Sequence, residues 1–336
     1  MVKSRFLKSV GGIGRRDFLK LGTAMGAMML MGYPNLLFGQ TTKRISIATG
    51  GMGGVWFPLG GGIASLISKY IPGVEAAAEV TSAAVDNCKL VAGEKSDLGL
   101  AIGDVAYDAL NGTGKFKEKL SLACLATLYS SPVHIVTIAG KGINSVTDLK
   151  GKKISTGAPN SGTESMALRV LEAYDINADK DIKRDRIGAS ESAGALKDGK
   201  IDAYFWTGGV PTASVLEIAS SPGIKIKLIS HGEAVDKMVA KYGNVYFKGV
   251  IPKGIYPGVD EDVTVAAVGN MLVSHEKMDS KLVYNIVKTI FEHLPELEAI
   301  HMEAANIKLQ RATVGSPLRF HEGAIRFYKE KGINID

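Results

Sequence analysis

The chain has 336 residues, of which 46% are hydrophobic and 7% aromatic, and it contains 40 glycines. This length and apolar content favour two folded domains and exclude a disordered chain. The net charge of +6 comes mostly from residues 1–39, because the rest of the chain carries 34 basic and 33 acidic side chains. Nucleic-acid binding needs a basic footprint on the folded part, so the charge distribution argues against a nucleic-acid partner.

The N-terminus has the order of an export signal. A basic stretch that ends in Arg15 and Arg16 precedes an uncharged apolar run over residues 21–31. This run is too short for a membrane span, which takes about 20 apolar residues. The arginine pair resembles that of a twin-arginine signal. We therefore expect residues 1–39 to be an export signal that is cleaved near Gly39, which would place the mature protein in the periplasm.

Strand-like and helix-like segments alternate along the rest of the chain. Five segments have the apolar character of strands: residues 44–48, 74–80, 98–102, 153–156 and 201–206. Between them, apolar residues recur at helical spacing, for example in the segment that contains Leu59, Ile63 and Ile67, and over residues 163–174. Such alternation predicts mostly parallel sheets that are covered by helices on both faces.

Two extended apolar stretches, residues 133–137 and 263–273, stand apart from this alternation. We interpret them as the strands by which the chain crosses into a second lobe and returns. Lobe I is then expected over residues 43–133 plus 269–336, and lobe II over residues 134–268. The end of the chain is predicted to form helices over residues 281–294, 298–310 and 321–332.

The sequence lacks the motifs of common catalytic and cofactor sites. It has no Gly-x-x-x-x-Gly-Lys-Ser/Thr phosphate loop, no His-Glu-x-x-His zinc motif and no Gly-x-Ser-x-Gly nucleophile elbow. Trp56 stands where a dinucleotide-binding loop needs a small residue. Cys88 lies in a helical pattern and Cys124 in a strand pattern, and we expect buried, unpaired thiols. The sequence therefore predicts no catalytic residue, cofactor or metal.

Two glycine-rich loops each end a strand and open a helix. The first covers residues 49–54, just before Trp56, and the second covers residues 157–164. A helix start presents free N–H groups and a partial positive charge, so it can hold a carboxylate without an arginine or lysine. For the second loop a structural alternative stays open, because Ser161 and Glu164 have the spacing of a capping box.

Two further loops follow predicted strands. Gly103 and Asp104 come after the strand at residues 98–102, and residues 207–211 come after the strand at residues 201–206. Each also has a simpler interpretation, as a helix cap and as a turn respectively. In doubly wound sheets, however, ligands bind at the carboxyl ends of the strands, and all four loops are expected there.

The loops and their neighbours together resemble the TAXI family of solute-binding proteins. These are extracytoplasmic receptors of tripartite ATP-independent periplasmic (TRAP) transporters. The likeness runs through the whole chain after the export signal, and it is carried by Thr49-Gly50-Gly51-x-Gly53-Gly54-x-Trp56-x-Pro58-Leu59-Gly60-Gly61, Asp104-Val105-Ala106-Tyr107 and His321-x-Gly323-Ala324-x-Arg326-x-Tyr328.

The resemblance implies an α/β fold of the type 2 periplasmic-binding-protein class, with two doubly wound lobes that are joined by crossing strands and close on a ligand. Family ligands include glutamate, glutamine and related carboxylates, and Asp104 would suit the amino group of an amino acid. Carried over by position, the resemblance places ligand binding at Gly51, Gly54, Trp56, Thr81, Asn87, Asp104, Tyr129, Asn160, Ser161, Gly162, Thr163, Glu164, Thr207, Gly208 and Gly209. The chain departs from the family pattern at Ile102-Gly103, where Gln-Ser is usual, and at Trp56, where Tyr is frequent.

The leading hypothesis is a monomeric, non-enzymatic receptor that captures a small carboxylate or amino acid and passes it to TRAP membrane subunits. Two alternatives stay open. The same binding module could serve an ABC transporter or a sensor kinase, or the scaffold could carry an enzyme.

The export hypothesis predicts the effect of a conservative change at the arginine pair. Changing Arg15 and Arg16 to lysine should leave precursor in the cytoplasm, because the export machinery recognises the arginine pair itself and not only its charge. Immunoblots of periplasmic and cytoplasmic fractions measure the two forms. Unchanged export of the variant would contradict the twin-arginine assignment.

Overall fold

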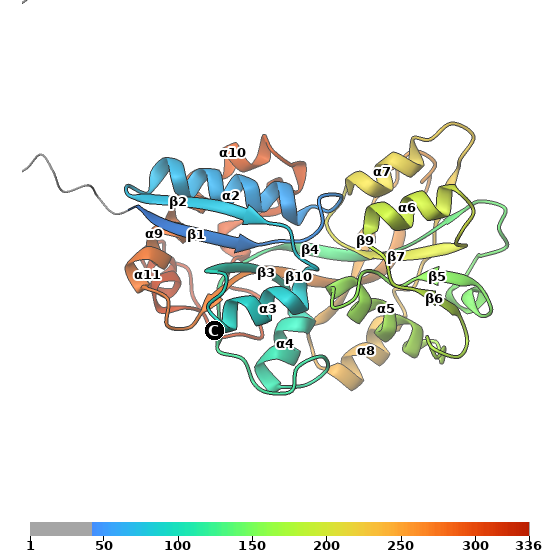
Figure 1. Cartoon of the computed structure of the whole chain (residues 1–336), viewed down its shortest axis with the longest axis horizontal. Helices are drawn as coiled ribbons and strands as arrows, with labels where there is room; N and C mark the ends of the chain where they lie inside the picture. The colour runs from blue at the N-terminus through green and yellow to red at the C-terminus, as the bar shows by residue number, and fades with distance from the viewer. Residues whose placement is uncertain (1–41, 336) are drawn as a thin grey trace, which may run out of the picture. The chain divides into compact units, whose positions relative to one another are not determined.

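The computed structural model of the protein describes residues 42–335. Residues 1–39, which the sequence predicts to be an export signal, lie outside this range. Figure 1 shows β1 and β2 at one end of the described part and β5 and β6 at the other, with β4 and β10 running between them. The two groups of strands form two lobes.

The first lobe is a mixed sheet with the strand order β2-β1-β3-β10-β4. Its strands are β1 (Lys43–Ala48), β2 (Val74–Glu79), β3 (Leu98–Ile102), β4 (Leu122–Ile138) and β10 (Val263–His275). One face is covered by α2 (Trp56–Tyr70), α9 (Ser280–Glu292), α10 (Leu294–Glu298) and α11 (Glu322–Glu330), and the other by α3 (Ala84–Ala92) and α4 (Gly103–Asn111). β1 is parallel to β2 and β3, whereas β10 is antiparallel to β3 and β4.

The second lobe repeats this plan with the strand order β4-β7-β5-β6. Its own strands are β5 (Lys153–Ser155), β6 (Lys183–Asp185) and β7 (Ala203–Thr207), while β8 (Ile226–Leu228) pairs with β4 and β9 (Tyr246–Ile251) with β10. The helices are α5 (Gly162–Ala173) and α8 (Ala234–Tyr242) on one face and α6 (Ala189–Lys197) and α7 (Ala213–Ala219) on the other, besides the short 3-10 helix η2 (Val146–Leu149).

Two long strands cross between the lobes. β4 pairs with β10 as far as Pro132 and with β7 from Val133 onward. β10 pairs with β9 up to Val268 and with β3 from Asn270. The predicted architecture of two lobes joined by crossing strands is therefore confirmed. β4 is longer than the predicted segment over residues 133–137, because residues 122–132 have a partner in β10. The exact residue limits of the lobes stay a prediction.

The sheets are mixed and not mostly parallel, since both crossing strands run antiparallel to their neighbours. A second correction concerns residues 298–310, which do not form one helix. After α10 the chain forms two short 3-10 helices, η3 (Met302–Asn306) and η4 (Leu309–Arg311). His301 has an extended backbone, and its Nδ1 accepts a hydrogen bond from the Glu303 N–H. This cap ends one helical segment and starts the next.

Helix α2 shows how the sequence sets the packing of the first lobe. Its buried face contains Leu59, Ile63 and Ile67, which are four residues apart. A Cβ on Gly60 would lie 2.4 Å from Thr49 Cγ2, and one on Gly62 would lie 2.8 Å from side-chain carbons of α10 and the residues just after it. Glycines inside this helix therefore let its backbone approach its neighbours closely, which outweighs their low helix propensity.

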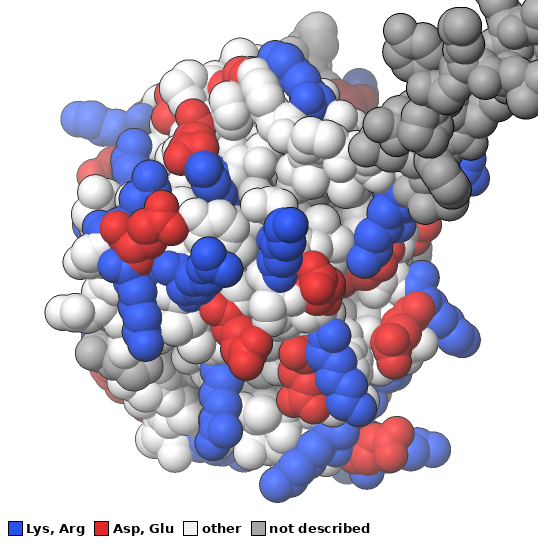
Figure 2. Space-filling model, turned by 90° about the vertical axis from the view of Figure 1, so that its left-hand side faces the viewer, with Lys and Arg blue, Asp and Glu red and all other residues white. Residues whose placement is uncertain are grey.

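The surface carries interspersed charges. On the face that Figure 2 shows, basic and acidic side chains alternate without a large patch of one sign. Exposed pairs such as Lys69 with Glu296 and Lys331 with Glu292 join opposite charges. In the described part of the chain, no helix combines the length and the apolar character that a membrane crossing requires.

A buried ionic network joins the two lobes on the side of α4 and α5. Arg169 of α5 lies 2.6 Å from the Asp104 carboxylate and also pairs with Asp108, both on α4. Its guanidinium hydrogen-bonds the Tyr246 hydroxyl as well. Asp104 is fully buried, and Arg169 is 8% exposed. The charges therefore depend on each other for compensation, because a lone buried charge is very unfavourable.

Replacing Arg169 with methionine should lower the free energy of unfolding by about 3–5 kcal/mol, since it leaves two acids without their cation. Urea unfolding followed by circular dichroism measures this loss. Lys200→Met serves as the control, because Lys200 pairs with Asp198 at the surface and its removal should change stability little. Equal losses in the two variants would contradict the network's structural role.

Candidate functional site

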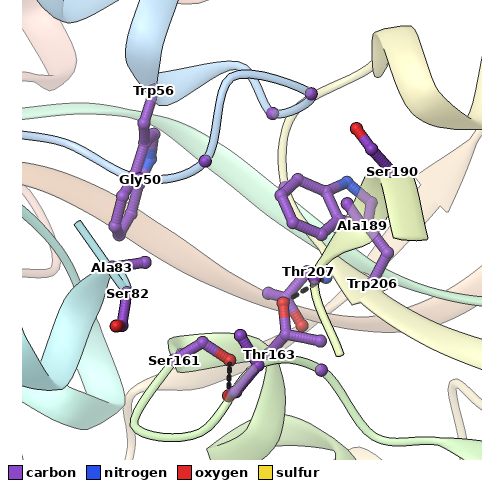
Figure 3. A pocket seen from close by; sticks show the side chains of 18 of the residues that line it. Gly50, Trp56, Ser82, Ala83, Ser161, Thr163, Ala189, Ser190, Trp206 and Thr207 are labelled. Atoms are coloured by element: carbon purple, nitrogen blue, oxygen red, sulfur yellow. Dashed lines mark hydrogen bonds between the residues drawn. The ribbon is translucent and has the colours of Figure 1, made fainter. Parts of the chain in front are cut away.

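A cavity of about 380 Å³ lies between the lobes, at the carboxyl ends of strands from both. Figure 3 shows it from close by. The first lobe contributes residues 50–56, 81–83 and Ile102 to its lining, and the second lobe contributes Gly157, Ala158, residues 161–163, 188–191 and 205–208. The predicted residues in this lining are Gly51, Gly54, Trp56, Thr81, Ser161, Gly162, Thr163, Thr207 and Gly208.

The first glycine loop reaches across to the second lobe. A Cβ on Gly53 would lie 2.0 Å from Ser190 Oγ, and one on Gly54 would lie 2.9 Å from Trp206 Cη2. The Gly53 carbonyl also accepts a hydrogen bond from the Ser214 N–H at 3.4 Å. By contrast, a Cβ on Gly51 would meet nothing within 4 Å. Glycine is therefore required at positions 53 and 54 for contact between the lobes.

Trp56 lines the cavity from the start of α2. Its indole Nε1 donates a hydrogen bond to Asn270 Oδ1 at 2.8 Å. Asn270 is buried on β10, and its amide donates to Ser131 Oγ at 2.6 Å and to the Tyr129 carbonyl at 3.1 Å. The crossing strands therefore fix the plane of the Trp56 ring.

Thr81 reaches the cavity, whereas Asn87 supports it from behind. The Asn87 amide donates to the carbonyls of Thr49 and Leu100 at 2.6 and 2.7 Å, and the Thr81 hydroxyl donates to Asn87 Oδ1 at 2.6 Å. Asn87 is fully buried and does not line the cavity. Its side chain ties the ends of β1 and β3 to α3, a structural role, and its predicted contact with the ligand stays a prediction.

The start of α5 supplies the lining from the second lobe. Ser161 is the N-cap, and its hydroxyl accepts the Glu164 N–H at 3.1 Å. Thr163 Oγ1 accepts the Thr207 N–H at 3.1 Å, which ties α5 to the end of β7. Thr207 lines the cavity and is 9% exposed, whereas its hydroxyl oxygen is buried and has no hydrogen-bond partner among the described residues.

Glu164 and Asn160 do not line the cavity. The Glu164 carboxylate is fully buried and pairs with Arg184 at 2.7 Å and Arg186 at 2.5 Å. Burial alone would raise the pKa of Glu164, but the hydrogen bonds from Arg186 and from the Asn160 N–H hold it below its ordinary value. The Asn160 carbonyl accepts the Val85 N–H at 3.2 Å. The helix therefore caps itself, as the structural alternative for this loop supposed.

Asp104 is also absent from the lining. In this structure the Asp104 carboxylate is buried against Arg169 and accepts the Val105 N–H, so the predicted contact with an amino group has no support from the geometry. Tyr129 and Gly209 lie behind the cavity as well. A Cβ on Gly209 would lie 2.7 Å from Glu303 Cγ and 2.8 Å from Tyr129 Cε2, so these residues pack on one another and not on the cavity.

Five helices begin at the cavity: α2, α3, α4, α5 and α6. Their N-cap residues, Val55, Ala83, Ile102, Ser161 and Gly188, all belong to the lining. Only Ser161 forms a side-chain cap; within the described residues the other four N-caps make no such hydrogen bond. The helix starts therefore direct N–H groups and partial positive charge toward the cavity. Glu191 is the only charged residue of the lining, and it is exposed.

Sequence reasoning missed several residues of the lining. The start of α6 at residues 188–190 was not singled out, although Gly188 before a helix is a known N-cap signal. Ala83 has φ 82°, a backbone conformation that a residue with a Cβ seldom adopts, and no sequence pattern indicates it. Trp206 was assigned to a strand, but its ring contacts Gly54 and lines the cavity.

Glu303 lies just behind the cavity. Its carboxylate accepts the Val210 N–H at 3.0 Å and the Asn306 amide at 3.2 Å. Burial raises the pKa of Glu303 from 4.5 to about 7, although these two hydrogen bonds oppose the shift. The folded protein therefore holds this proton more tightly than the unfolded chain does.

This shift predicts a pH-dependent contribution to stability. Because the pKa is raised on folding, the stabilisation is present at low pH and is lost as the pH rises from about 4.5 to about 7, by up to about 3 kcal/mol. Glu303→Gln should remove this part of the pH dependence, whereas the exposed Glu261→Gln should not. Urea unfolding at about pH 5 and about pH 8 tests the difference. Parallel pH profiles for the natural chain and Glu303→Gln would contradict it.

Comparison with solved structures supports the fold. The chain is similar to MatC from Rhodopseudomonas palustris with bound malate, with a TM-score of 0.56 and 12% identity over 86% of this chain and 97% of that one. It is also similar to a protein from Bordetella bronchiseptica RB50, with a TM-score of 0.54 and 15% identity over 87% and 99% of the two chains. The predicted type 2 periplasmic-binding-protein fold is confirmed.

The family follows from the sequence comparison. The NMT1-like family matches residues 47–332, which is most of the chain and includes every residue of the cavity lining. This family corresponds to the TAXI-type substrate-binding proteins of TRAP transporters, so the resemblance seen in the sequence is confirmed. The chain belongs to the NMT1-like family, and it is a solute-binding protein of that family.

Proposed function

We propose that the protein captures a small carboxylate outside the cytoplasm, by closure of its two lobes, and delivers it to the membrane subunits of a TRAP transporter. The observation that carries the proposal is the meeting of five helix starts at one cavity whose lining has no basic side chain among the described residues. Such a site provides N–H donors and partial positive charge, which suit a single anionic group.

The polar side chains of the lining also favour an anionic ligand. The unpartnered Thr207 hydroxyl is a donor that needs an acceptor, because a buried hydroxyl without a hydrogen bond is unfavourable. It lies beside Thr163, at the start of α5. A carboxylate at this place would accept from the hydroxyl and from backbone N–H groups together. A cation would instead meet the positive ends of the helices.

Closure is supported by the contacts that join the lobes across the cavity. Gly53 and Gly54 of the first lobe pack on Ser190 and Trp206 of the second. These four residues also line the cavity, so the contacts lie at its wall. A ligand held between the two sets of loops would stabilise this arrangement, because it binds both lobes at once.

A further support comes from the similar fold of MatC, whose structure holds malate. Malate bears carboxylates, so the fold accommodates ligands of this kind. The amino-acid form of the hypothesis has less support, since Asp104 is engaged by Arg169. We therefore propose a carboxylate ligand and do not propose an amino acid.

The carboxylate proposal is tested by thermal shift with acids and their uncharged amides. Malate, 2-oxoglutarate, 3-methylbutanoate and 3-phenylpropanoate are each compared with the corresponding amide. Acids that bind should raise the melting temperature and their amides should not, because an amide carries no charge for the helix starts. Equal stabilisation by amides, or stabilisation by uncharged sugars alone, would contradict the proposal.

Thr207→Val should weaken binding of the best acid by about tenfold or more, since the variant loses one hydrogen bond to a charged group. Thr207→Ser keeps the hydroxyl and should bind within a few-fold of the natural protein. Isothermal titration calorimetry measures both affinities. Equal affinity of the valine variant would show that the hydroxyl does not contact the ligand.

A further inference from the structure

Both tryptophans of the chain, Trp56 and Trp206, line the same cavity. They come from different lobes, since Trp56 begins α2 and Trp206 lies near the end of β7. In Figure 3 the two indoles stand on either side of the cavity, with Ser161 and Thr163 on the wall between them. A ligand held at the start of α5 would therefore extend between two rings.

The polar atom of each indole is already used within the protein. Trp56 Nε1 donates to Asn270 Oδ1 at 2.8 Å, and Trp206 Nε1 donates to Thr212 Oγ1 at 2.8 Å. Each ring is half-buried. The surfaces that the rings leave for a ligand are consequently their apolar faces and carbon edges, which favour apolar or aromatic groups.

The rings are also held in place. Trp206 fits against Gly54 and Gly208, where a Cβ would lie 2.9 and 2.6 Å from ring carbons. Its partner Thr212 is fixed by two further hydrogen bonds: the Thr212 N–H donates to the Tyr256 hydroxyl at 2.9 Å, and its hydroxyl donates to the Gly209 carbonyl at 2.7 Å. Rings that are fixed before binding lose little conformational freedom when they enclose a ligand.

Within the described residues, the cavity lining holds no buried acid for a charged amine. Asp104 and Glu164 are paired with arginines, Glu303 accepts hydrogen bonds from the Val210 N–H and the Asn306 amide, and none of the three lines the cavity. Glu191 does line it, but this side chain is exposed and its carboxylate lies beside Gly188, in the first turn of α6, where an acid complements the helix start. The helix starts at the cavity would repel a positively charged group.

We infer that the ligand is a carboxylate with a flat, apolar, ring-containing body that lies between Trp56 and Trp206, and that it carries no charged amino group. This inference rests on the proposed function, because the helix starts must bind the carboxylate. It adds the chemical nature of the part of the ligand that lies between the two tryptophans. Trp206 acts as the specificity-determining residue of the second lobe, and Trp56 as that of the first.

Three probes that differ from 3-phenylpropanoate by one group separate the parts of the inference. Phenylalanine adds an ammonium group, glutarate replaces the ring with a carboxymethyl group that carries a second carboxylate, and 3-phenylpropanamide removes the charge. We expect 3-phenylpropanoate to bind more than about tenfold more tightly than phenylalanine or glutarate, because each of these would bury an unpaired charge. The natural protein suffices for this comparison, so no variant has to fold.

The two tryptophans provide a direct readout, since no other indole contributes to the fluorescence. In Trp56→Phe only Trp206 emits, and in Trp206→Phe only Trp56 emits. Binding of 3-phenylpropanoate should change the emission of both variants. Trp206→Leu removes the aromatic face and should weaken the binding of 3-phenylpropanoate by roughly threefold to tenfold. The binding of glutarate should be unchanged.

The outcomes distinguish the ring-binding inference from the carboxylate proposal. Tighter binding of phenylalanine or glutarate than of 3-phenylpropanoate would overturn the inference and leave the carboxylate proposal standing. If 3-phenylpropanamide binds as tightly as the acid, the carboxylate proposal fails while the ring-binding part is supported. If 3-phenylpropanoate changes neither the emission nor the melting temperature at millimolar concentration, the inference is wrong.

Discussion

The antiparallel pairing of β4 with β10 is the constraint on which the cavity depends. Both strands change partners at the crossing, near Val133 and Val268, so the strands of the two lobes end facing one another. The ladder shifts register between Gly269 and Met271, and such irregularities re-aim a side chain. The side chain between them is Asn270, which holds the Trp56 indole. The same pair of strands therefore joins the lobes and positions the aromatic wall of the first lobe.

Several buried acids near the cavity are paired with basic side chains. Asp104 and Asp108 share Arg169, and Glu164 is surrounded by basic side chains from other segments. Removing an ion from water costs several kcal/mol, so these acids require their partners. Because these acids are engaged by basic side chains and do not line the cavity, the helix starts remain as a source of partial positive charge at its wall. In the proposed function, an anion would be held there by backbone groups, which many different sequences can supply.

The sequence allowed the fold to be predicted well, because apolar periodicity reports buried faces directly. Strands such as Lys43–Ala48 and Leu98–Ile102 and helices such as Trp56–Tyr70 lie within a few residues of their predicted bounds. The site could be predicted only in part. Glycine loops and helix starts have local signals, whereas the pairing of Asp104 with Arg169 joins residues that are 65 positions apart. A local pattern cannot tell whether a buried acid faces a ligand or an arginine.

The glycine loop shows how a correct motif can have a different physical reason from the one first supposed. Close approach of a ligand was the expected reason for its glycines, and Gly51, which has no protein atom within 4 Å of a Cβ, is compatible with it. Gly53 and Gly54, by contrast, face side chains of the second lobe, and a Cβ at either position would collide with Ser190 or Trp206 in this structure. The motif therefore serves the contact between the lobes, and it bears on the site as well, because the Trp206 ring next to Gly54 is also a wall of the cavity.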